Sequence, residues 1–409
     1  MNALVLGHGR SGKAAEALLC RSGFSATVLD GDAAFPSGGF DCAVVSPGIA
    51  LTHPWIVEAK RRGIPLKSEL QLGCEELKRQ GWKLLAVTGS KGKSSVVKVV
   101  ADAINLAGMK AVACGNYGTP VCEVALEDGR RETEDGRKCW AVVEVSSFMM
   151  ETTELPADTF EAAAILNLQE DHLDRHGSVE VYHGLKRKLL TFAVRNFVNG
   201  GLSSEHPGIR ATGHLWTRSY FDNEILSGNA AMAVGLMRVA GLEDAEIAAA
   251  FKAFEPLPHR MNLVAEIEGV RFVDDSKATS LAALIAGVKM VSSGNRTAGQ
   301  PDSRTIRLIA GGLPKGDDPK AACSTLTERV RKVYLIGQSA ETFGAAWADA
   351  ADCEICETLD RAVLRAMREA ESGETVLLSP GTASFDQFKS FGERGDAFAD
   401  LVKKERKKR

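Results

Sequence analysis

The sequence predicts an α/β protein of three domains. Short apolar runs alternate with helical patterns along much of the chain, and 409 residues are more than one core usually holds. Glycine-rich turns follow the first apolar run of the first two domains. We expect a Rossmann-like sheet in residues 1–80, a central P-loop ATPase-like and mostly parallel sheet in 81–257, and a second Rossmann-like domain in 258–409.

Composition and charge exclude several classes of protein. The net charge of −3 gives no nucleic-acid signature, and no run approaches the ~18 apolar residues of a membrane span. The first residues enter a strand without a signal-peptide pattern, so we expect a cytoplasmic protein. The nine cysteines favour buried thiols over disulfides. Cys353 and Cys356 form a lone C-x-x-C that no second pair or nearby histidine completes into a zinc set.

The first domain starts with a strand, a glycine turn and a helix. We expect a helix from Gly12 to Arg21 and strands at Ala3–Leu6, Ala26–Leu29 and Cys42–Val45. Gly7, Gly9 and Gly12 match G-x-G-x-x-G, and Asp30 ends the next strand where an acid can reach a ribose. This pattern suits a nicotinamide dinucleotide equally well.

A second turn in this domain, Ser46-Pro47-Gly48-Ile49, ends the third strand. A dinucleotide does not explain it. The two turns meet at the carboxyl edge of one sheet, where they could together hold another nucleotide. The alternative is that both are ordinary strand-to-helix turns.

The central domain opens with LLAVTGSKGKSS, residues 84–95, which predicts a strand, a phosphate-binding loop and a helix. Gly89 and Gly92 allow backbone N–H groups to surround anionic oxygens at the helix N-terminus. Lys93 adds a cation for the terminal phosphates, and Ser94 lies where a hydroxyl can ligate the magnesium of a nucleoside triphosphate. The loop is shorter than the generic G-x-x-x-x-G-K-[ST].

Acids and histidines follow the next two apolar strands, which we expect at Trp140–Phe148 and Ala162–Leu166. Glu144 is a candidate for holding magnesium beside the phosphate loop. His172, within residues 167–176, suggests a divalent-metal site. His172 and His176 lie four apart but lack the glutamate that a zinc-protease helix needs after its first histidine. Lys186 by itself would be an ordinary surface lysine.

The rest of the chain again alternates. We expect helices at Asn229–Val239 and Glu243–Phe251, then a linker at Phe254–Pro258, because its two close prolines cannot lie within a helix. Residues 123–138 and 292–303 are polar, and we expect them to be surface segments. The last domain should contain a helix after Thr279, a helix near Asp360–Ala370, and strands at Val270–Val273, Thr305–Ala310, Lys332–Ile336 and Thr375–Leu378.

Taken together, the motifs resemble those of the Mur ligases, which add amino acids to the peptidoglycan precursor. The resemblance covers nearly the whole chain. It rests on SPGI at Ser46, TGSKGKSS at Thr88, GNYG at Gly115, EVSSF at Glu144, LNLQEDHLDRHGS at Leu166, PHR at Pro258, DDSKATS at Asp274, GGLPKG at Gly311 and LSPGTASFDQFKSFGERG at Leu378. Among family members the chain is most similar to those that add D-glutamate, because the Tyr-Ala-His and Asn-Pro-Arg signatures of other members are missing.

The resemblance implies how ATP and two Mg²⁺ ions are held. ATP would contact the loop and further groups, namely Gly89, Ser90, Lys91, Gly92, Lys93, Ser94, Ser95, Asn229, Arg260, Asp275 and Lys277. Ser94 and Glu144 would hold one magnesium ion, and His172 a second. Lys186, in the family's Y-x-x-x-K setting, would carry a carbamate that ligates metal, with Lys188 as the fallback. The implied catalytic residues are Lys93, Glu144, His172 and Lys186.

The resemblance also implies two small-molecule substrates, UDP-N-acetylmuramoyl-L-alanine and D-glutamate, and we expect a monomer. The first domain would hold the UDP group with Gly9, Ser11, Gly12, Asp30, Ser46, Pro47 and Gly48. Asn116 and His172 would place the sugar and its alanyl arm. The third domain would close over ATP, and D-glutamate would contact Thr279, Lys315, Ser384, Phe385 and Phe391.

The chain departs from the family pattern at several positions. Ser90, Lys91 and Ser95 replace residues of the usual T-G-T-N-G-K-S-T, the segment 191–226 is short, and the adenine motif is reduced to Ser227-Gly228-Asn229. Two alternatives stay open. One is a related ligase with another acceptor, such as a folylpolyglutamate synthetase or a poly-γ-glutamate-forming enzyme. The other is a nucleotide-binding regulatory protein without turnover.

Overall fold

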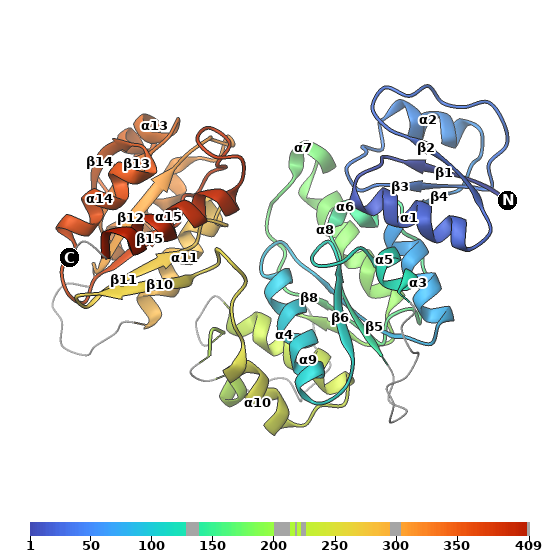
Figure 1. Cartoon of the computed structure of the whole chain (residues 1–409), viewed down its shortest axis with the longest axis horizontal. Helices are drawn as coiled ribbons and strands as arrows, with labels where there is room; N and C mark the ends of the chain where they lie inside the picture. The colour runs from blue at the N-terminus through green and yellow to red at the C-terminus, as the bar shows by residue number, and fades with distance from the viewer. Residues whose placement is uncertain (128–138, 200–212, 217–218, 222–225, 295–303, 407–409) are drawn as a thin grey trace. The chain divides into compact units, whose positions relative to one another are not determined.

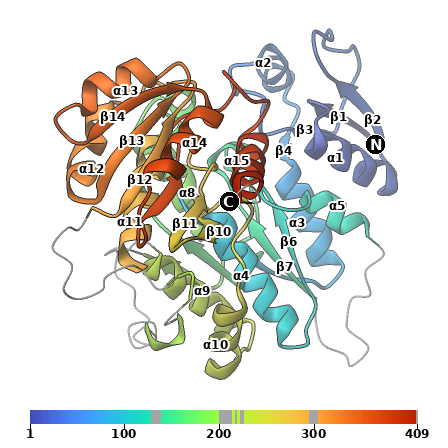
Figure 2. The same ribbon diagram turned by 60° about the vertical axis from the view of Figure 1, so that its left-hand side comes forward.

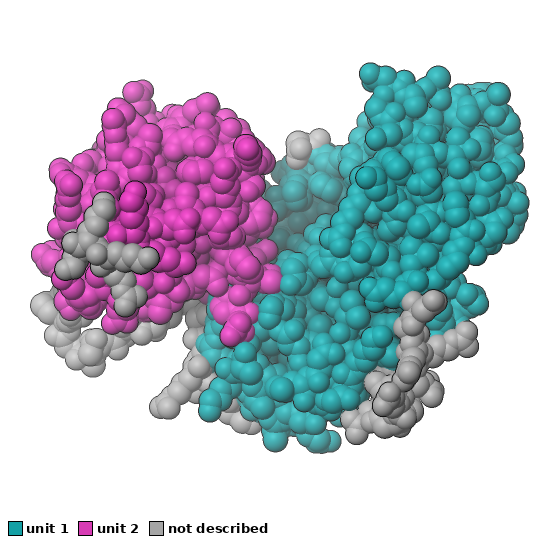
Figure 3. All heavy atoms as spheres, in the orientation of Figure 1, with its two compact units in different colours: residues 1–222, 226–254 teal, residues 223–225, 255–409 magenta. Residues whose placement is uncertain are grey.

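The computed structural model describes residues 1–127, 139–199, 213–216, 219–221, 226–294 and 304–406. The described residues up to Phe254 form one compact unit, and those from Glu255 onward form a second (Figure 3). The predicted linker Phe254–Pro258 contains this division. Within the described residues, no helix combines the length and the apolar character that crossing a membrane requires.

The N-terminal sheet of the first unit has four parallel strands in the order β2-β1-β3-β4 (Figure 1). Their bounds are Asn2–Leu6 for β1, Ser25–Leu29 for β2, Cys42–Val45 for β3 and Leu66–Ser68 for β4. Helices α1 (Arg10–Arg21), α2 (Pro54–Arg61) and α3 (Glu69–Arg79) accompany it. Leu4 and Leu6 pack with α2 on one face, whereas Ala3 and Val5 pack with α1 on the other.

The central sheet of the same unit has five parallel strands in the order β6-β7-β5-β8-β9. The bounds are Lys83–Thr88 for β5, Ala111–Gly115 for β6, Trp140–Glu144 for β7, Ala162–Ile165 for β8 and Asn196–Val198 for β9. Because β5 lies between β7 and β8, the ends of all three strands meet beside the loop that follows β5.

The helices of the central part connect these strands. They are α4 (Lys93–Leu106), α5 (Val121–Leu126), α6 (Ser147–Met150), α7 (Leu173–His176), α8 (Val179–Lys188), α9 (Ser227–Val239) and α10 (Asp244–Ala253), with 3₁₀ turns at Leu189–Phe192 and Gly213–Trp216. Helix α4 packs on β6 and β7 (Figure 2). Helix α9 packs on α4 and β8.

Two predictions for the central part need correction. The strand predicted to reach Phe148 ends at Glu144, because the Ser146 hydroxyl caps a new helix, α6, by accepting from the N–H of Met149. The polar segment 123–138 begins within α5, and its residues 128–138 lie outside the described residues. Most of the short segment 191–226 lies outside them as well.

The second unit is a six-stranded sheet in the order β10-β11-β15-β12-β13-β14. Strands β10 (Asn262–Ile267) and β11 (Val270–Asp274) form an antiparallel hairpin, and β12 (Ile306–Gly311), β13 (Val330–Ile336), β14 (Asp352–Glu357) and β15 (Thr375–Leu378) run parallel. The helices are α11 (Leu281–Gly294), α12 (Cys323–Arg329), α13 (Ala340–Trp347), α14 (Leu359–Glu369) and α15 (Phe391–Arg406), with a 3₁₀ turn at Pro319–Ala322. The predicted loop 292–303 begins inside α11, and 295–303 lie outside the described residues.

The C-x-x-C pair lies on strand β14. Cys353 packs against the core on one face of the sheet, with Trp347, whereas Cys356 packs on the other, with Leu359 and Val363. Residues three apart in a strand point to opposite faces, so the two thiols cannot share a metal or form a disulfide. Cys353 is partly buried and Cys356 is buried, and this burial raises the pKa of each to about 11, which keeps both thiols protonated.

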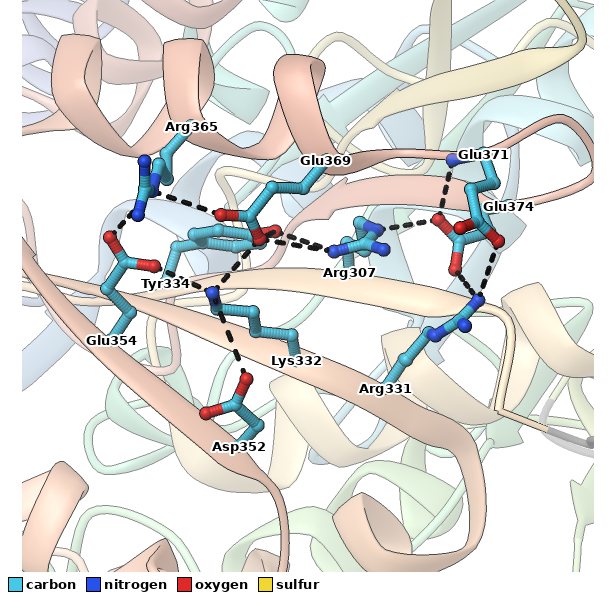
Figure 4. A network of polar contacts seen from close by, with 10 residues as sticks. All are labelled: Arg307, Arg331, Lys332, Tyr334, Asp352, Glu354, Arg365, Glu369, Glu371 and Glu374. Carbon is cyan, nitrogen blue, oxygen red and sulfur yellow. Dashed lines mark hydrogen bonds and ion pairs between the residues drawn. The ribbon is translucent and has the colours of Figure 1, made fainter.

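A network of charged residues joins the amino ends of the parallel strands of this sheet (Figure 4). Arg307 on β12 is buried; its Nε donates to Glu374 Oε2 at 2.6 Å and its Nη1 to the Tyr334 hydroxyl at 2.9 Å. Tyr334 in turn donates to Glu369 at 2.9 Å. The remaining members, at the edges of the network, are Arg331, Lys332, Asp352, Glu354, Arg365 and Glu371.

Glu374 shows how this network depends on pH. Burial alone would raise the pKa of Glu374, but hydrogen bonds from Arg307 and Arg331 outweigh it, so that the pKa is lowered. A carboxyl group with a lowered pKa stabilises the fold above its unfolded-state pKa. That stabilisation is lost as the pH falls toward the folded-state pKa.

We predict that Arg307→Met destabilises the second unit by about 1.5–3 kcal/mol, because the Glu374 carboxylate loses its buried arginine partner and retains only the more exposed Arg331. Hydrogen exchange of the amides of β12 and β13 during urea unfolding measures the change. Arg368→Met, at an exposed arginine of α14, is the matched control and should alter stability little. Equal stability of the two variants would contradict the role given to Arg307.

Candidate active site

The loop between β5 and α4 has a backbone conformation that favours glycine at two positions. Gly89 has φ +155° and Gly92 has φ +83°. A Cβ at Gly92 would collide with the side-chain amide of Asn229, which is buried in the first turn of α9. Helix α4 begins at Gly92 without a side-chain cap, so its first N–H groups have no helical acceptor. An anion accepts from such N–H groups readily.

Residues that follow β8 hold this loop in place. The Asn167 side chain accepts from the N–H of Lys91 at 2.8 Å and donates to its carbonyl at 2.9 Å. The Ser90 hydroxyl accepts from the N–H of Gln169 at 3.0 Å and lies 3.2 Å from the Tyr182 hydroxyl. The loop is thus fixed by contacts to two other segments of the chain.

Two lysines meet at the carbonyl oxygen of Gly89. The Nζ of Lys93 donates to it at 2.8 Å and the Nζ of Lys186 at 3.0 Å. Lys186 is 1% exposed and lies 4.5 Å above the Tyr182 ring. Burial, followed by repulsion from Lys93, lowers the pKa of Lys186 to about 7. Lys186 is therefore no surface lysine.

Two other lysines near the loop make ion pairs. Lys91, which departs from the family pattern, pairs with Asp171 at 3.3 Å. Lys188, the fallback for the carbamate, pairs with the exposed Glu154 at 2.6 Å. Of the two candidates on α8, only Lys186 is buried against the loop.

Glu144 ends β7 beside the loop and is 2% exposed. Its Oε1 accepts from the Asn116 side chain at 2.7 Å, whereas no described residue donates to its buried Oε2. A buried carboxylate oxygen without a donor is costly, and a bound cation removes that cost. Glu144 therefore fits a magnesium ligand, and Asn116 orients it.

His172 lies on the turn before α7, in a left-handed backbone conformation with φ +54°. Its half-exposed ring is 4.9 Å from the Phe148 ring. The backbone N–H of His172 donates to the Asp171 carboxylate at 3.1 Å. No three His, Cys, Asp or Glu side chains gather as a metal site within the part of the chain that the structure describes. Magnesium commonly binds through one or two protein ligands plus phosphate and water, which the few groups at this edge would allow.

The two turns of the N-terminal sheet lie against each other. Gly7 has φ +89°, and the Ser46 hydroxyl donates to its carbonyl at 2.8 Å. A Cβ at Gly12 would collide with the same carbonyl. The Asp30 carboxylate accepts from the N–H of His8 at 3.3 Å. The exposed or half-exposed residues around these turns include Gly9, Ser11, Asp30, Ser46, Pro47 and Gly48.

The second unit gathers several predicted residues at the carboxyl ends of β11 and β15. Asp275 is buried and accepts from the Ser379 hydroxyl at 2.9 Å. Burial raises the pKa of Asp275 to about 7, although Ser379 and Arg260 oppose that shift. The Nζ of Lys277 lies 4.0 Å from the centre of the Phe391 ring.

The residues predicted for the amino acid lie on neighbouring loops of this unit. Backbone hydrogen bonds between Leu313 and Ala383 join the loop of Lys315 to that of Ser384. Ser384 is buried, Lys315 is exposed, and Phe385 is 69% exposed. Thr279 lies between Lys277 and the start of α11, with its N–H donating to the carbonyl of Lys277 at 2.8 Å.

Two residues that shape these sites were not predicted from the sequence. Arg394, 1% exposed, donates from Nε and Nη2 to Ser276 and from Nη2 and Nη1 to the carbonyls of Thr382 and Ala383. It thus joins the loops after β11 and β15. The other is Asn167. Both occur inside recognised motifs, but only three-dimensional contacts distinguish them from their neighbours.

A glycine loop before a helix, with lysines and a buried carboxylate at the ends of parallel strands, is the arrangement of P-loop nucleotide-binding enzymes. Residues 87–199 match the Mur ligase middle domain, and residues 259–381 match the Mur ligase glutamate ligase domain. The UDP-N-acetylmuramoylalanine–D-glutamate ligase of Nitrosococcus oceani is 32% identical over 456 aligned positions, covering 98% of this chain and 96% of that protein. The chain belongs to the Mur ligase family.

Solved structures agree on the fold. The UDP-N-acetylmuramate-alanine ligase MurC of Thermotoga maritima matches with a TM-score of 0.59 at 14% identity, covering 99% of this chain and 100% of that one. The MurF ligase of Thermotoga maritima, solved in complex with ADP, matches with a TM-score of 0.58 at 14% identity, covering 99% and 95%. The predicted fold class and family are confirmed.

We predict that Asn167→Asp loosens the phosphate loop, because a carboxylate cannot donate to the carbonyl of Lys91. Amides of residues 89–93 should exchange about fivefold faster, since one net hydrogen bond is worth ~1 kcal/mol. Asn105 makes the same two contacts with Ala111, so Asn105→Asp is a matched control that should leave the loop unchanged. Equal exchange of the loop amides in both variants would refute the proposed role of Asn167 in holding the loop.

Proposed function

We propose that the chain is an ATP-dependent ligase that joins D-glutamate to UDP-N-acetylmuramoyl-L-alanine during peptidoglycan precursor synthesis. The name and near-complete coverage of the relative from Nitrosococcus oceani support this substrate pair. One structural observation carries the proposal. The glycine loop, the buried Lys186 and Glu144 lie together at one edge of the sheet, and no described residue donates to Glu144 Oε2. We place the reaction in the cytoplasm and expect a monomer.

The chemistry has two steps. The alanyl carboxylate attacks the γ-phosphorus of ATP, which releases ADP and forms an acyl phosphate. The neutral amine of D-glutamate then attacks the acyl carbon, so that an amide forms and phosphate leaves while the amine loses a proton. The N-terminus of α4 and Lys93 stabilise the negative charge of the phosphates. Ser94 and Glu144 would hold one magnesium ion, and His172 with modified Lys186 a second; magnesium supplies further charge neutralisation when bound.

The proposed modification of Lys186 is a carbamate, formed when the neutral amine attacks CO₂ and releases a proton. An exposed lysine is almost fully protonated at pH 7 and reacts poorly. With a pKa of about 7, about half of the Lys186 amine is neutral at that pH. Burial thus prepares Lys186 for the reaction, and the product is an anionic oxygen ligand.

The substrate roles of the remaining predicted residues belong to the same proposal. The paired turns at Gly7 and Ser46 would hold the UDP group, and they favour a UDP-linked acceptor over the acceptors of other ligases. In the second unit, the buried Ser384 and the loop of Lys315 would hold D-glutamate, and Asp275 and Lys277 would contact ATP.

Phosphate release tests the proposal. Release should require ATP, magnesium, UDP-N-acetylmuramoyl-L-alanine and D-glutamate together, with the amide product identified by mass spectrometry. Phosphate release that continues without D-glutamate and the UDP-sugar would refute the proposal. Release with a different acceptor would favour the related-ligase alternative, and ATP binding without any amide would favour a protein without turnover.

We predict that Lys186→Ala abolishes amide formation and that added formate partly restores it, because a small carboxylate can occupy the place of the carbamate. Lys188→Ala is the matched control two residues away and should retain most activity, since that side chain pairs with the exposed Glu154. Phosphate release with and without formate measures both variants. Loss of activity without rescue, at unchanged magnesium affinity, would argue that Lys186 is structural.

A further inference from the structure

Arg175 lies on the short helix α7, Leu173–His176. Its Nη2 donates to the carbonyl of Ile49 at 2.7 Å and approaches that of Pro47 at 3.4 Å. Both acceptors belong to the turn after β3 in the N-terminal sheet. The sequence separation exceeds 120 residues, so Arg175 is a long-range connection between the N-terminal and central sheets.

The same guanidinium is held firmly from the central side. Its Nε lies 3.1 Å from Glu151 Oε1, and its Nη2 lies 2.7 Å from Glu151 Oε2, a two-point ion pair. The two side chains are 16% and 7% exposed. Arg175 also lies over the Phe148 ring, at 5.1 Å from its centre. A planar group fixed at two points aims its remaining N–H donors in one direction.

Glu151 has a second side-chain partner, His176. Its Nδ1 lies 3.3 Å from Glu151 Oε1, and its Nε2 lies 3.0 Å from the Ser147 hydroxyl. Ser147 begins α6, three residues after Glu144. The connection therefore runs from the turn of Ser46, through Arg175 and Glu151, to the segment that carries Glu144.

The near end of this connection also reaches the glycine turn. The N–H of Ile49 donates to the carbonyl of Ser46 at 3.0 Å, and Ser46 contacts the carbonyl of Gly7. Arg175 itself lies three residues beyond His172 on the same segment. Arg175 thus connects both turns of the N-terminal sheet with the His172 turn and with the end of β7.

We propose that Arg175 is a positioning residue that sets the spacing between the UDP-binding turns and the reacting end of the same substrate molecule. This inference rests on the proposed function. One substrate must place its UDP group on the N-terminal sheet and its alanyl carboxylate beside Glu144 and His172, so an error in that spacing misplaces the attacking oxygen. A misplacement of ~1 Å can reduce a rate 100-fold.

Arg175→Gln and Glu151→Gln test the role in the full-length chain. Arg195→Gln is the matched control, at an exposed arginine of the same unit. For each variant we would measure kcat and KM for UDP-N-acetylmuramoyl-L-alanine, the KM for ATP, and the affinity for UDP alone by calorimetry. Hydrogen exchange of residues 46–51 provides a readout that needs no turnover.

A positioning role predicts a selective pattern. Arg175→Gln should lower kcat/KM for the UDP-sugar about 10- to 100-fold, leave the KM for ATP and the affinity for UDP alone within about twofold, and speed exchange at residues 46–51. Glu151→Gln should show the same pattern more weakly, because its amide still accepts from Arg175. Arg195→Gln should match the unmodified protein in every measurement.

Other outcomes overturn the proposal. An equal loss of affinity for UDP alone would make Arg175 part of the pocket, and an equal rise in the KM for ATP would indicate general disruption. Unchanged exchange at residues 46–51 would show that Arg175 does not hold the turn. If Arg175→Gln does not fold, Arg175→Lys and Glu151→Gln decide by the same measurements. Absence of turnover in the unmodified protein refutes the proposed function instead, and the exchange data still test the connection.

Discussion

The carbonyl oxygen of Gly89 accepts hydrogen bonds from two lysines, and the central site depends on that convergence. Gly89 presents the carbonyl because its φ of +155° is open to glycine alone. Lys93 comes from the first turn of α4 and Lys186 from α8, so one backbone oxygen connects the helix proposed to bind phosphate with the helix proposed to carry a metal ligand. Two ammonium groups so close repel each other, which contributes to the low pKa of Lys186. If the proposed function holds, phosphate binding and carbamate formation are linked through this repulsion.

Much of the fold could be predicted from the sequence, because buried parallel strands read as apolar runs. Cys42–Val45 and Thr375–Leu378 were predicted to the residue. The edge strand β14 was missed, since Asp352–Glu357 alternates charged and apolar residues without a continuous run. The three-residue β4 was missed because so short a strand gives no periodic pattern.

The candidate site likewise contains residues that a local motif predicts and residues that only the assembled structure identifies. The loop geometry at Gly89, Gly92 and Lys93 could be predicted because a short local motif encodes it. Lys186 has no local signal for burial, and only the family resemblance singled it out. Asn167 and Arg394 act on backbone groups of distant segments, and such partners become visible only when the sheets are assembled. The roles given to the individual site residues stay predictions.

Asn229 occupies the space where a side chain at position 92 would begin. The two positions belong to different helices, α4 and α9, yet each limits what the other can be. A larger residue at 92 would need both a left-handed backbone and a smaller neighbour at 229, so single substitutions there meet a barrier that a paired change would lower. The residue tolerated at either position therefore depends on the residue at the other.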